Sequence, residues 1–285
     1  MKKNLFISWN IRGLGSLDKK AAVKRLVQKL KPSVLFIQES KLQVVNDRIF
    51  SRICGNFLNL KMVFSGSAGA AGGLISLWDP NFFECESSWI GLSFIVLLGK
   101  FVGSNIKCVL VNVYAPSLVE DRKELFVELI AKLENLKSSL IIGGDFNTVR
   151  DRSKRLGVSF NKRASGDFVD FIEALGLSDM PPHGSQFTWS NYRDAPSFSR
   201  LDRFLVSDNI LVLWPDLFQQ VLPKSISDHN PVCLSCIGDC WGPRPFKWFE
   251  STLDSLEYVD LIVQTCSGSS SIGIMPLLSE CKKSD

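Results

Sequence analysis

Helical and strand-like patterns of apolar residues alternate along this chain, and that alternation limits its fold more than any other feature. Residues 23–30 carry apolar side chains at helical spacing, and residues 34–39 (VLFIQE) follow as a dense apolar run typical of a strand. A second round consists of a strand-like run at 107–116, a helical pattern at 117–133 and a strand-like run at 140–147. This order predicts an α/β fold with mixed sheets.

The boundaries of the later elements can also be predicted. Ser117 and Glu120 have the spacing of a capping box, which predicts that the second helix begins there. The periodic pattern fades after residue 237, so we expect one domain over 1–237 and a weakly structured tail over 238–285. Between the second helix and residue 237 the sequence has one more helical pattern, with Phe168, Phe171, Ile172 and Leu175. It also has three strand-like runs, at 187–191 (FTWSN), 201–207 (LDRFLVS) and 231–236 (PVCLSC).

Polar side chains stand at or beside the ends of these apolar runs with a regularity that turn chemistry does not explain. Asp and Asn are common turn residues, so each one taken singly is typical of a loop that ends a strand. Asp202 differs because it lies within an apolar run, where a buried carboxylate needs a partner. In α/β sheets the strand ends are where sites are assembled. The residues concerned are Asn10, Glu39, Tyr114, Asp145, Asn147, Asp202, Asp228 and His229.

Six short motifs contain these residues: WNIRG (9–13), QES (38–40), NVYAP (112–116), GGDFN (143–147), RLDRFL (200–205) and SDHNP (227–231). In this order and spacing they resemble the motif series of the endonuclease/exonuclease/phosphatase superfamily, over about residues 4–237. The resemblance implies a four-layer α/β/β/α sandwich with two mixed β-sheets, like that of DNase I. FTWSN and RPFKW (244–248) make the chain most similar to the endonuclease domain of plant LINE-type (non-LTR) retrotransposon proteins.

The resemblance also implies a metal and a way of holding the phosphate. Glu39 would be the principal ligand of Mg²⁺, or of Mn²⁺, with Asp228 near the metal, because a hard carboxylate suits a hard cation. Asn10 and Asn147 would hold the phosphate and the surrounding hydrogen bonds, and Tyr114 would donate to a phosphate oxygen.

The remaining residues would handle protons. By resemblance, Asp145 would orient and deprotonate the attacking water, while His229 would contact the scissile phosphate. Asp202 would fix the tautomer of His229 by accepting from its other ring nitrogen. The sequence leaves open whether Asp145 or His229 is the base. Gly143 and Gly144 are expected to let the backbone approach the reacting phosphate closely.

Arg12 departs from the pattern of many repair nucleases of this superfamily, which have an acidic residue two positions after the asparagine of the first motif. The site is therefore expected to depend more on Glu39 for its metal, and repair of abasic sites is disfavoured.

A basic segment at 150–163 points towards nucleic acid. It has six basic residues against one acid, a net charge of +5, whereas the whole chain has +4. A solvated loop and a surface that binds the DNA backbone explain it equally well. The residues predicted to bind the backbone are Arg150, Arg152, Lys154 and Arg155.

These observations lead to the hypothesis of a Mg²⁺-dependent phosphodiesterase that nicks DNA and derives from a retrotransposon endonuclease. Its alternatives are a repair-type abasic-site endonuclease or exonuclease, a phosphatase of small phosphate esters, and an idle relic that binds nucleic acid. The last is considered because the tail would lead towards a reverse transcriptase that the chain lacks. We expect a monomer without a small organic cofactor or membrane contact. No signal-peptide core is seen, so we expect it inside the cell, nuclear or cytoplasmic and not secreted, with its eight cysteines reduced.

Overall fold

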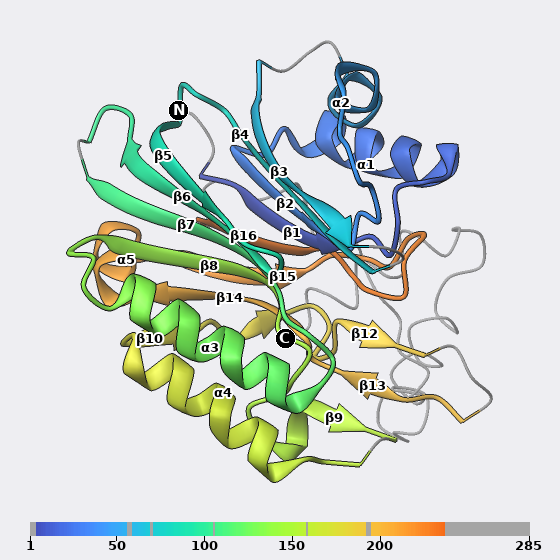
Figure 1. Cartoon of the computed structure of the whole chain (residues 1–285), viewed down its shortest axis with the longest axis vertical. Coiled ribbons are helices and arrows are strands. Elements are labelled where there is room, and N and C mark those ends of the chain that lie inside the picture. Colours follow the sequence, from blue (N-terminus) through green and yellow to red (C-terminus); the bar gives the residue numbers. More distant parts are fainter. Residues whose placement is uncertain are drawn as a thin grey trace, which may run out of the picture. The chain divides into compact units, whose positions relative to one another are not determined.

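Two mixed β-sheets pack face to face, and helices cover the outer face of each sheet (Figure 1). The computed structural model describes residues 4–236, except 56–58, 69–70, 105, 158 and 192–194. The predicted four-layer α/β/β/α sandwich is confirmed. The tail at 238–285, with its RPFKW motif, lies outside the described residues, and so does the predicted domain boundary.

The first sheet contains the strands that end in the first two motifs. Helices α1 (Leu17–Leu30) and α2 (Asp47–Cys54) lie over its outer face (Figure 1). Its strand order is β11 (Pro182–His183), β15 (Leu217–Val221), β16 (Val232–Cys236), β1 (Phe6–Asn10), β2 (Val34–Gln38), β4 (Ala71–Trp78) and β3 (Lys61–Ala68).

The second sheet contains the strands that end in Tyr114 and Asp145. Helices α3 (Val119–Leu133) and α4 (Lys162–Ala174) cover its outer face, and α5 (Asp208–Leu213) follows its strand β14. Its strand order is β10 (Leu177–Asp179), β14 (Asp202–Ser207), β8 (Ser139–Asp145), β7 (Lys107–Tyr114), β6 (Phe94–Phe101) and β5 (Phe83–Ile90). A small third sheet holds β12 (Trp189–Ser190), β13 (Phe198–Ser199) and β9 (Arg155–Leu156), beside the 3₁₀ turn η1 (Arg152–Lys154).

The helix starts follow local chemistry, with one difference from expectation. Ser16 caps α1 by accepting from the backbone N–H of Lys19, and the helix ends before Pro32. The capping box predicted at Ser117 is wrong, because α3 begins after Leu118 and no side chain caps it. The predicted strand at 187–191 shrinks to the two residues of β12.

Aromatic side chains fill both hydrophobic layers. Between the sheets, the rings of Phe36 and Phe204 lie 6.3 Å apart, and under α3 and α4 the rings of Phe126 and Phe171 stack at 4.8 Å. Gly143 belongs to the inner layer, because a Cβ there would lie 2.4 Å from Phe204 Cε1.

Gly144 is equally constrained, since its Cβ would lie 2.0 Å from the carbonyl oxygen of Val113. Packing therefore accounts for both glycines, and the predicted close approach of this backbone to the phosphate stays a prediction. Both glycines make room for protein atoms: Gly143 for Phe204 of the neighbouring strand β14 and for Phe36 of the facing sheet, and Gly144 for strand β7.

Candidate active site

Strand pairing, parallel for β7–β8 and β1–β2 and antiparallel for β8–β14, brings the predicted site residues to one edge of the sandwich. In the second sheet the register sets Asp145 beside Tyr114 of β7 on one side and beside Asp202 of β14 on the other. In the first sheet Asn10 pairs with Gln38, the residue before Glu39. Because rigid strands fix these side chains, their arrangement is set by the fold.

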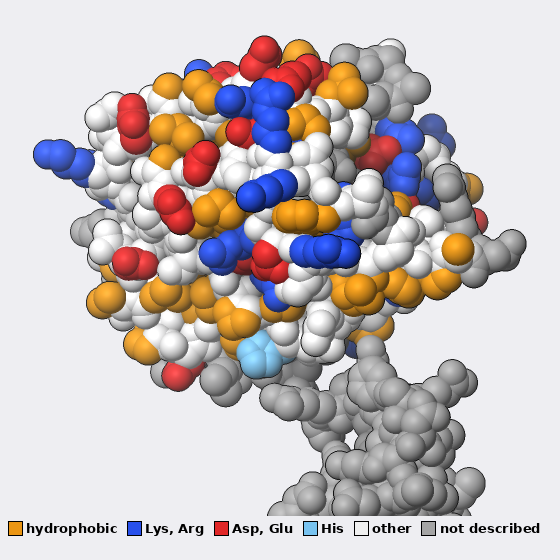
Figure 2. Space-filling model, turned by 90° about the horizontal axis from the view of Figure 1, so that it is seen from below, with side chains coloured by type: hydrophobic (Ala, Val, Ile, Leu, Met, Phe, Trp, Pro, Cys, Tyr) orange, Lys and Arg blue, Asp and Glu red, His pale blue; other side chains and the backbone are white. Residues whose placement is uncertain are grey.

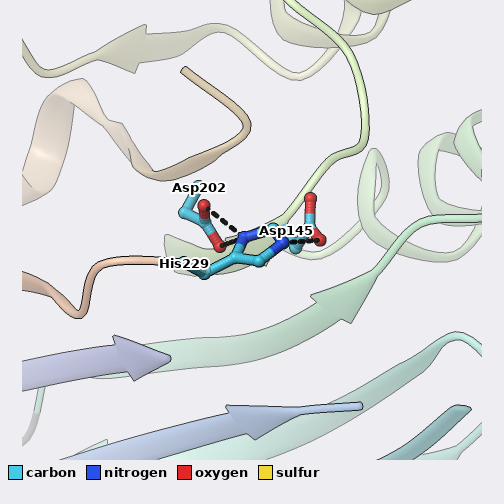
Figure 3. A group of neighbouring side chains, drawn as sticks. All are labelled: Asp145, Asp202 and His229. Carbon is cyan, nitrogen blue, oxygen red and sulfur yellow. Dashed lines mark hydrogen bonds and ion pairs between the residues drawn. The ribbon is translucent and has the colours of Figure 1, made fainter. Parts of the chain in front are cut away.

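The imidazole of His229 lies between two carboxylates (Figure 3). Its Nδ1 is 2.9 Å from Asp202 Oδ2 and 3.1 Å from Oδ1, and its Nε2 is 3.9 Å from Asp145 Oδ2. All three side chains are buried. A carboxylate only accepts, so Asp202 sets the proton on Nδ1 and leaves Nε2 facing Asp145.

Burial and charge shift the pKa values of this group in ways that suit proton transfer. Burial raises the pKa of Asp145 to about 6, the charge of Asp202 adds to that, and His229 opposes it. Burial alone would lower the pKa of His229, but the charges of Asp202 and Asp145 outweigh it and raise the pKa to about 9. At neutral pH the carboxylate of Asp145 therefore faces an imidazolium.

Two asparagines hold the carboxylate of Asp145. The Nδ2 of Asn10 donates to Asp145 Oδ2 at 2.9 Å and to Glu39 Oε2 at 3.3 Å, so it joins the two sheets. The backbone N–H of Asn147 donates to Asp145 Oδ1 at 2.9 Å, and its side chain donates to the carbonyl of Ala115 at 2.7 Å. Asp145 is thereby fixed on both oxygens.

Glu39 follows strand β2 and lies among cations and a phenol. Its Oε1 is 3.1 Å from Lys41 Nζ and 3.9 Å from Arg12 Nε. Burial, together with the negative charges of Glu39 and Asp145, raises the pKa of Tyr114 well above its usual range. The phenol thus stays protonated and able to donate.

Asp228 lies on the other side of Arg12. Its Oδ2 pairs with Arg12 Nη1 and accepts from Trp189 Nε1 at 3.0 Å, and its Oδ1 is buried with no hydrogen-bond partner in the part of the chain that the structure describes. Burial works to raise the pKa of Asp228, but the charges of His229 and Arg12 hold it below its usual range. Asp228 is thus ionised.

The donor set suits a divalent cation. Glu39 and Asp228 offer hard carboxylate oxygens, and the unpartnered Oδ1 of Asp228 is free to take a cation. Asp145, Asp202 and His229 also place ligand-type atoms within 4.8 Å of one another. In that group, however, Asp202 already engages His229 Nδ1, which suits proton handling better than metal binding.

The predicted DNA-binding residues divide into two kinds. Arg155 Nε donates to Ser199 Oγ at 3.0 Å, and Arg150 Nη1 lies 3.7 Å from Asp179, so both have partners within the protein. Arg152 is exposed and Lys154 is half-buried. On the face seen from below, Lys and Arg side chains lie among Asp and Glu side chains (Figure 2). Binding of DNA by this segment stays a prediction.

Three residues make contacts in the site that the sequence did not predict. Lys41 pairs with Glu39, and it stands two positions after Glu39 in the chain. Trp189, known only as part of FTWSN, donates to Asp228 and pairs with His229 in an isolated β-bridge. Arg12 was noted as a departure, but its contacts with both proposed metal ligands required the structure.

Comparison with known proteins supports the family that the motifs indicate. The sequence profile described as "Endonuclease/Exonuclease/phosphatase family" matches residues 7–229. The "Transposon TX1 uncharacterized 149 kDa protein" of Xenopus laevis is 35% identical over 134 residues, which are 44% of this chain and 10% of that protein. The chain thus matches only a tenth of that relative's length.

Two solved structures are similar in fold. The AP endonuclease LMAP from Leishmania major has a TM-score of 0.66 at 19% identity, covering 82% of this chain and 88% of that one. The endonuclease domain of TRAS1, a telomere-specific non-LTR retrotransposon, has a TM-score of 0.58 at 16% identity, covering 82% and 98%. The resemblance read from the motifs is thus confirmed at the level of family and fold, with transposon-encoded proteins among the matches. No helix within the described residues is both long and apolar enough to cross a membrane.

Proposed function

Because the chain belongs to the endonuclease/exonuclease/phosphatase family, we propose that it is a Mg²⁺-dependent phosphodiesterase that nicks DNA and derives from a retrotransposon endonuclease. The observation that carries this proposal is the placement of His229 between Asp202 and Asp145, all three buried at the end of the second sheet. Hydrolysis of a phosphodiester needs an oriented water, a proton acceptor and donors for the charge that develops. In this proposal Asp145 orients the water and accepts its proton, and His229 supplies a donor for the developing charge.

Asp145 is the proposed proton acceptor. With a pKa of about 6 it is ionised at neutral pH, and Asn10 and Asn147 hold both of its oxygens. A water beside it would be oriented for in-line attack and would lose its proton to the carboxylate. His229, with a pKa of about 9, enters as a cation instead and stabilises charge on the phosphate oxygens.

Other side chains would bind the reacting phosphate. Glu39, joined by Asp228, would hold Mg²⁺, which when bound offsets the negative charge of the phosphate. Tyr114, kept protonated beside Glu39, donates to a phosphate oxygen. Asn10 and Asn147 keep the surrounding hydrogen bonds in place.

DNA is the proposed substrate because the endonuclease domain of the retrotransposon TRAS1 is among the similar structures and because of the basic segment at 150–163. Arg152 and Lys154, which are not committed to ion pairs in the described contacts, would meet the backbone, with Arg150 and Arg155 beside them. Incubation with supercoiled plasmid tests this. Nicked circles that require Mg²⁺ would support it, preferential cleavage at abasic sites would favour a repair enzyme, and release of phosphate from small esters would favour a phosphatase.

A further inference from the structure

Arg12 reaches both carboxylates that are proposed to hold the metal. Its Nη1 pairs with Asp228 Oδ2, and its Nε lies 3.9 Å from Glu39 Oε1. Lys41 Nζ lies 3.1 Å from the same Glu39 oxygen. In this arrangement two cationic side chains of the chain itself balance the two carboxylates.

The backbone of Arg12 is held by hydrogen bonds, whereas its side chain is half-exposed. Its φ of 52° lies in the left-handed region, its N–H donates to Asn10 Oδ1 at 3.0 Å, and its carbonyl accepts from Lys19 Nζ at 2.6 Å. The side chain is 48% exposed, so water surrounds half of it. The guanidinium is therefore able to leave Asp228 by side-chain rotation, without any change in the backbone.

We propose that Arg12 is a built-in cation that competes with the divalent cation for Glu39 and Asp228. The proposal rests on the proposed function for the identity of the metal ligands. A divalent ion that entered beside Arg12 and Lys41 would add two charges to a pair of carboxylates that are already neutralised. The divalent ion therefore binds tightly only when the guanidinium of Arg12 moves away from Asp228 and Glu39. An incoming phosphate can then accept hydrogen bonds from the displaced guanidinium. Metal and substrate therefore bind more tightly together than singly.

The competition can be measured without DNA, by titrating the full-length protein with Mn²⁺ and following the electron paramagnetic resonance of the free ion. We expect Arg12→Met to bind Mn²⁺ at least about tenfold more tightly than the wild type, because it removes a positive charge next to both ligands. Arg12→Lys keeps the charge and should stay near the wild type. Arg25→Met, an exposed site on α1, is the matched control and should leave the affinity unchanged.

The site of the gain is tested by adding Glu39→Gln to Arg12→Met, which should abolish it. Equal affinities of the wild type and Arg12→Met would overturn the proposal. So would equal affinities of Arg12→Met and Arg12→Lys, because packing and not charge would then be responsible, or a gain that survives Glu39→Gln. Thermal melting of each variant shows whether it is folded. A protein that shows the competition and yet leaves plasmid intact would keep this inference and refute the proposed nicking activity.

Discussion

Asp202 Oδ2 and His229 Nδ1 lie 2.9 Å apart, although 27 residues separate them in the sequence. Both side chains are buried, and Asp202 is the charge that contributes most to keeping the imidazole protonated. The second ring nitrogen, Nε2, faces Asp145. This relationship links a structural carboxylate to the group proposed to meet the phosphate.

The first prediction concerns the pH dependence of nicking. Asp145 must be ionised and His229 protonated, so kcat/KM should rise through about pH 6 and fall through about pH 9. Asp202→Asn removes the charge that contributes most to raising the pKa of His229, and the alkaline limb should then move to lower pH. If the alkaline limb of the pH profile lies at the same pH in Asp202→Asn as in the wild type, His229 is not the group that titrates there.

The second prediction concerns stability at the same carboxylate. The folded pKa of Asp145 is raised above its unfolded value, so its protonated form stabilises the fold at low pH, and this contribution is lost as pH rises through about 6. The Asp145→Asn side chain stays neutral, so at pH 8 the free energy of unfolding of this variant should be no lower than that of the wild type. Urea unfolding at pH 4 and pH 8 measures this, and a large loss of stability at pH 8 would contradict the account.

The third prediction concerns the buried ion pairs that Asp179 makes with Arg200 and Arg203. Asp179 accepts from Arg200 Nη2 at 2.7 Å and from Arg203 Nη1 at 3.0 Å, and both arginines are buried. Asp179→Asn leaves two buried guanidinium groups without their hydrogen-bonded carboxylate and should cost roughly 3–5 kcal/mol of unfolding free energy. Asp151→Asn, at an exposed site, is the control and should cost far less.

The fourth prediction concerns the basic segment. Changing Arg152 and Lys154 to Ala should make the log–log salt slope of DNA binding shallower by up to about 2 units, since each phosphate contact contributes about 0.9. Arg48→Ala with Lys107→Ala removes the same charge from exposed positions elsewhere and should leave the slope unchanged.

The two remaining arginines of the segment extend this test. Adding Arg150→Ala and Arg155→Ala should bring the change in slope to roughly 3 to 4 units, but Arg155 also binds Ser199, so the melting temperature should fall as well. An unchanged slope in the double variant would show the segment to be only a solvated loop.

The fifth prediction concerns the tail. Because the periodic pattern is lost after residue 237, truncation after Ile237 should leave the melting temperature and nicking nearly unchanged. Calorimetry and the plasmid assay of the truncated protein check this. A marked fall in either would show that residues 238–285 are part of the folded domain.

The sequence predicted those parts of the fold that depend on local pattern. The apolar runs before Glu39, Tyr114 and Asp145 are strands β2, β7 and β8, and the helical patterns are α1, α3 and α4. Contacts between distant segments were not predictable in the same way. Asp179 is an ordinary residue in the sequence, and its role becomes visible only when the fold brings Arg200 and Arg203 beside it.

In the candidate site, too, local motifs were predictable from the sequence and contacts between distant segments were not. The motif residues were identified, but the partners of Glu39 and Asp228 were not, because an ion pair between residues 12 and 228 leaves no periodic signal. Gly143 was interpreted from its place in a motif, whereas the packing of Phe204 against it explains the glycine. Local pattern reports the strand and its end, while the neighbouring strands and the facing sheet decide what each side chain meets.

The most direct test compares the wild type with Asp145→Asn on supercoiled plasmid, with and without Mg²⁺. Removing the proposed proton acceptor should lower the nicking rate by about 10³-fold, while circular dichroism and thermal melting show an intact fold. Glu39→Ala and His229→Ala should each cause a loss of the same kind, and Asp151→Asn should cause none. Nicking by Asp145→Asn at a rate near that of the wild type would contradict the central claim that Asp145 activates the attacking water.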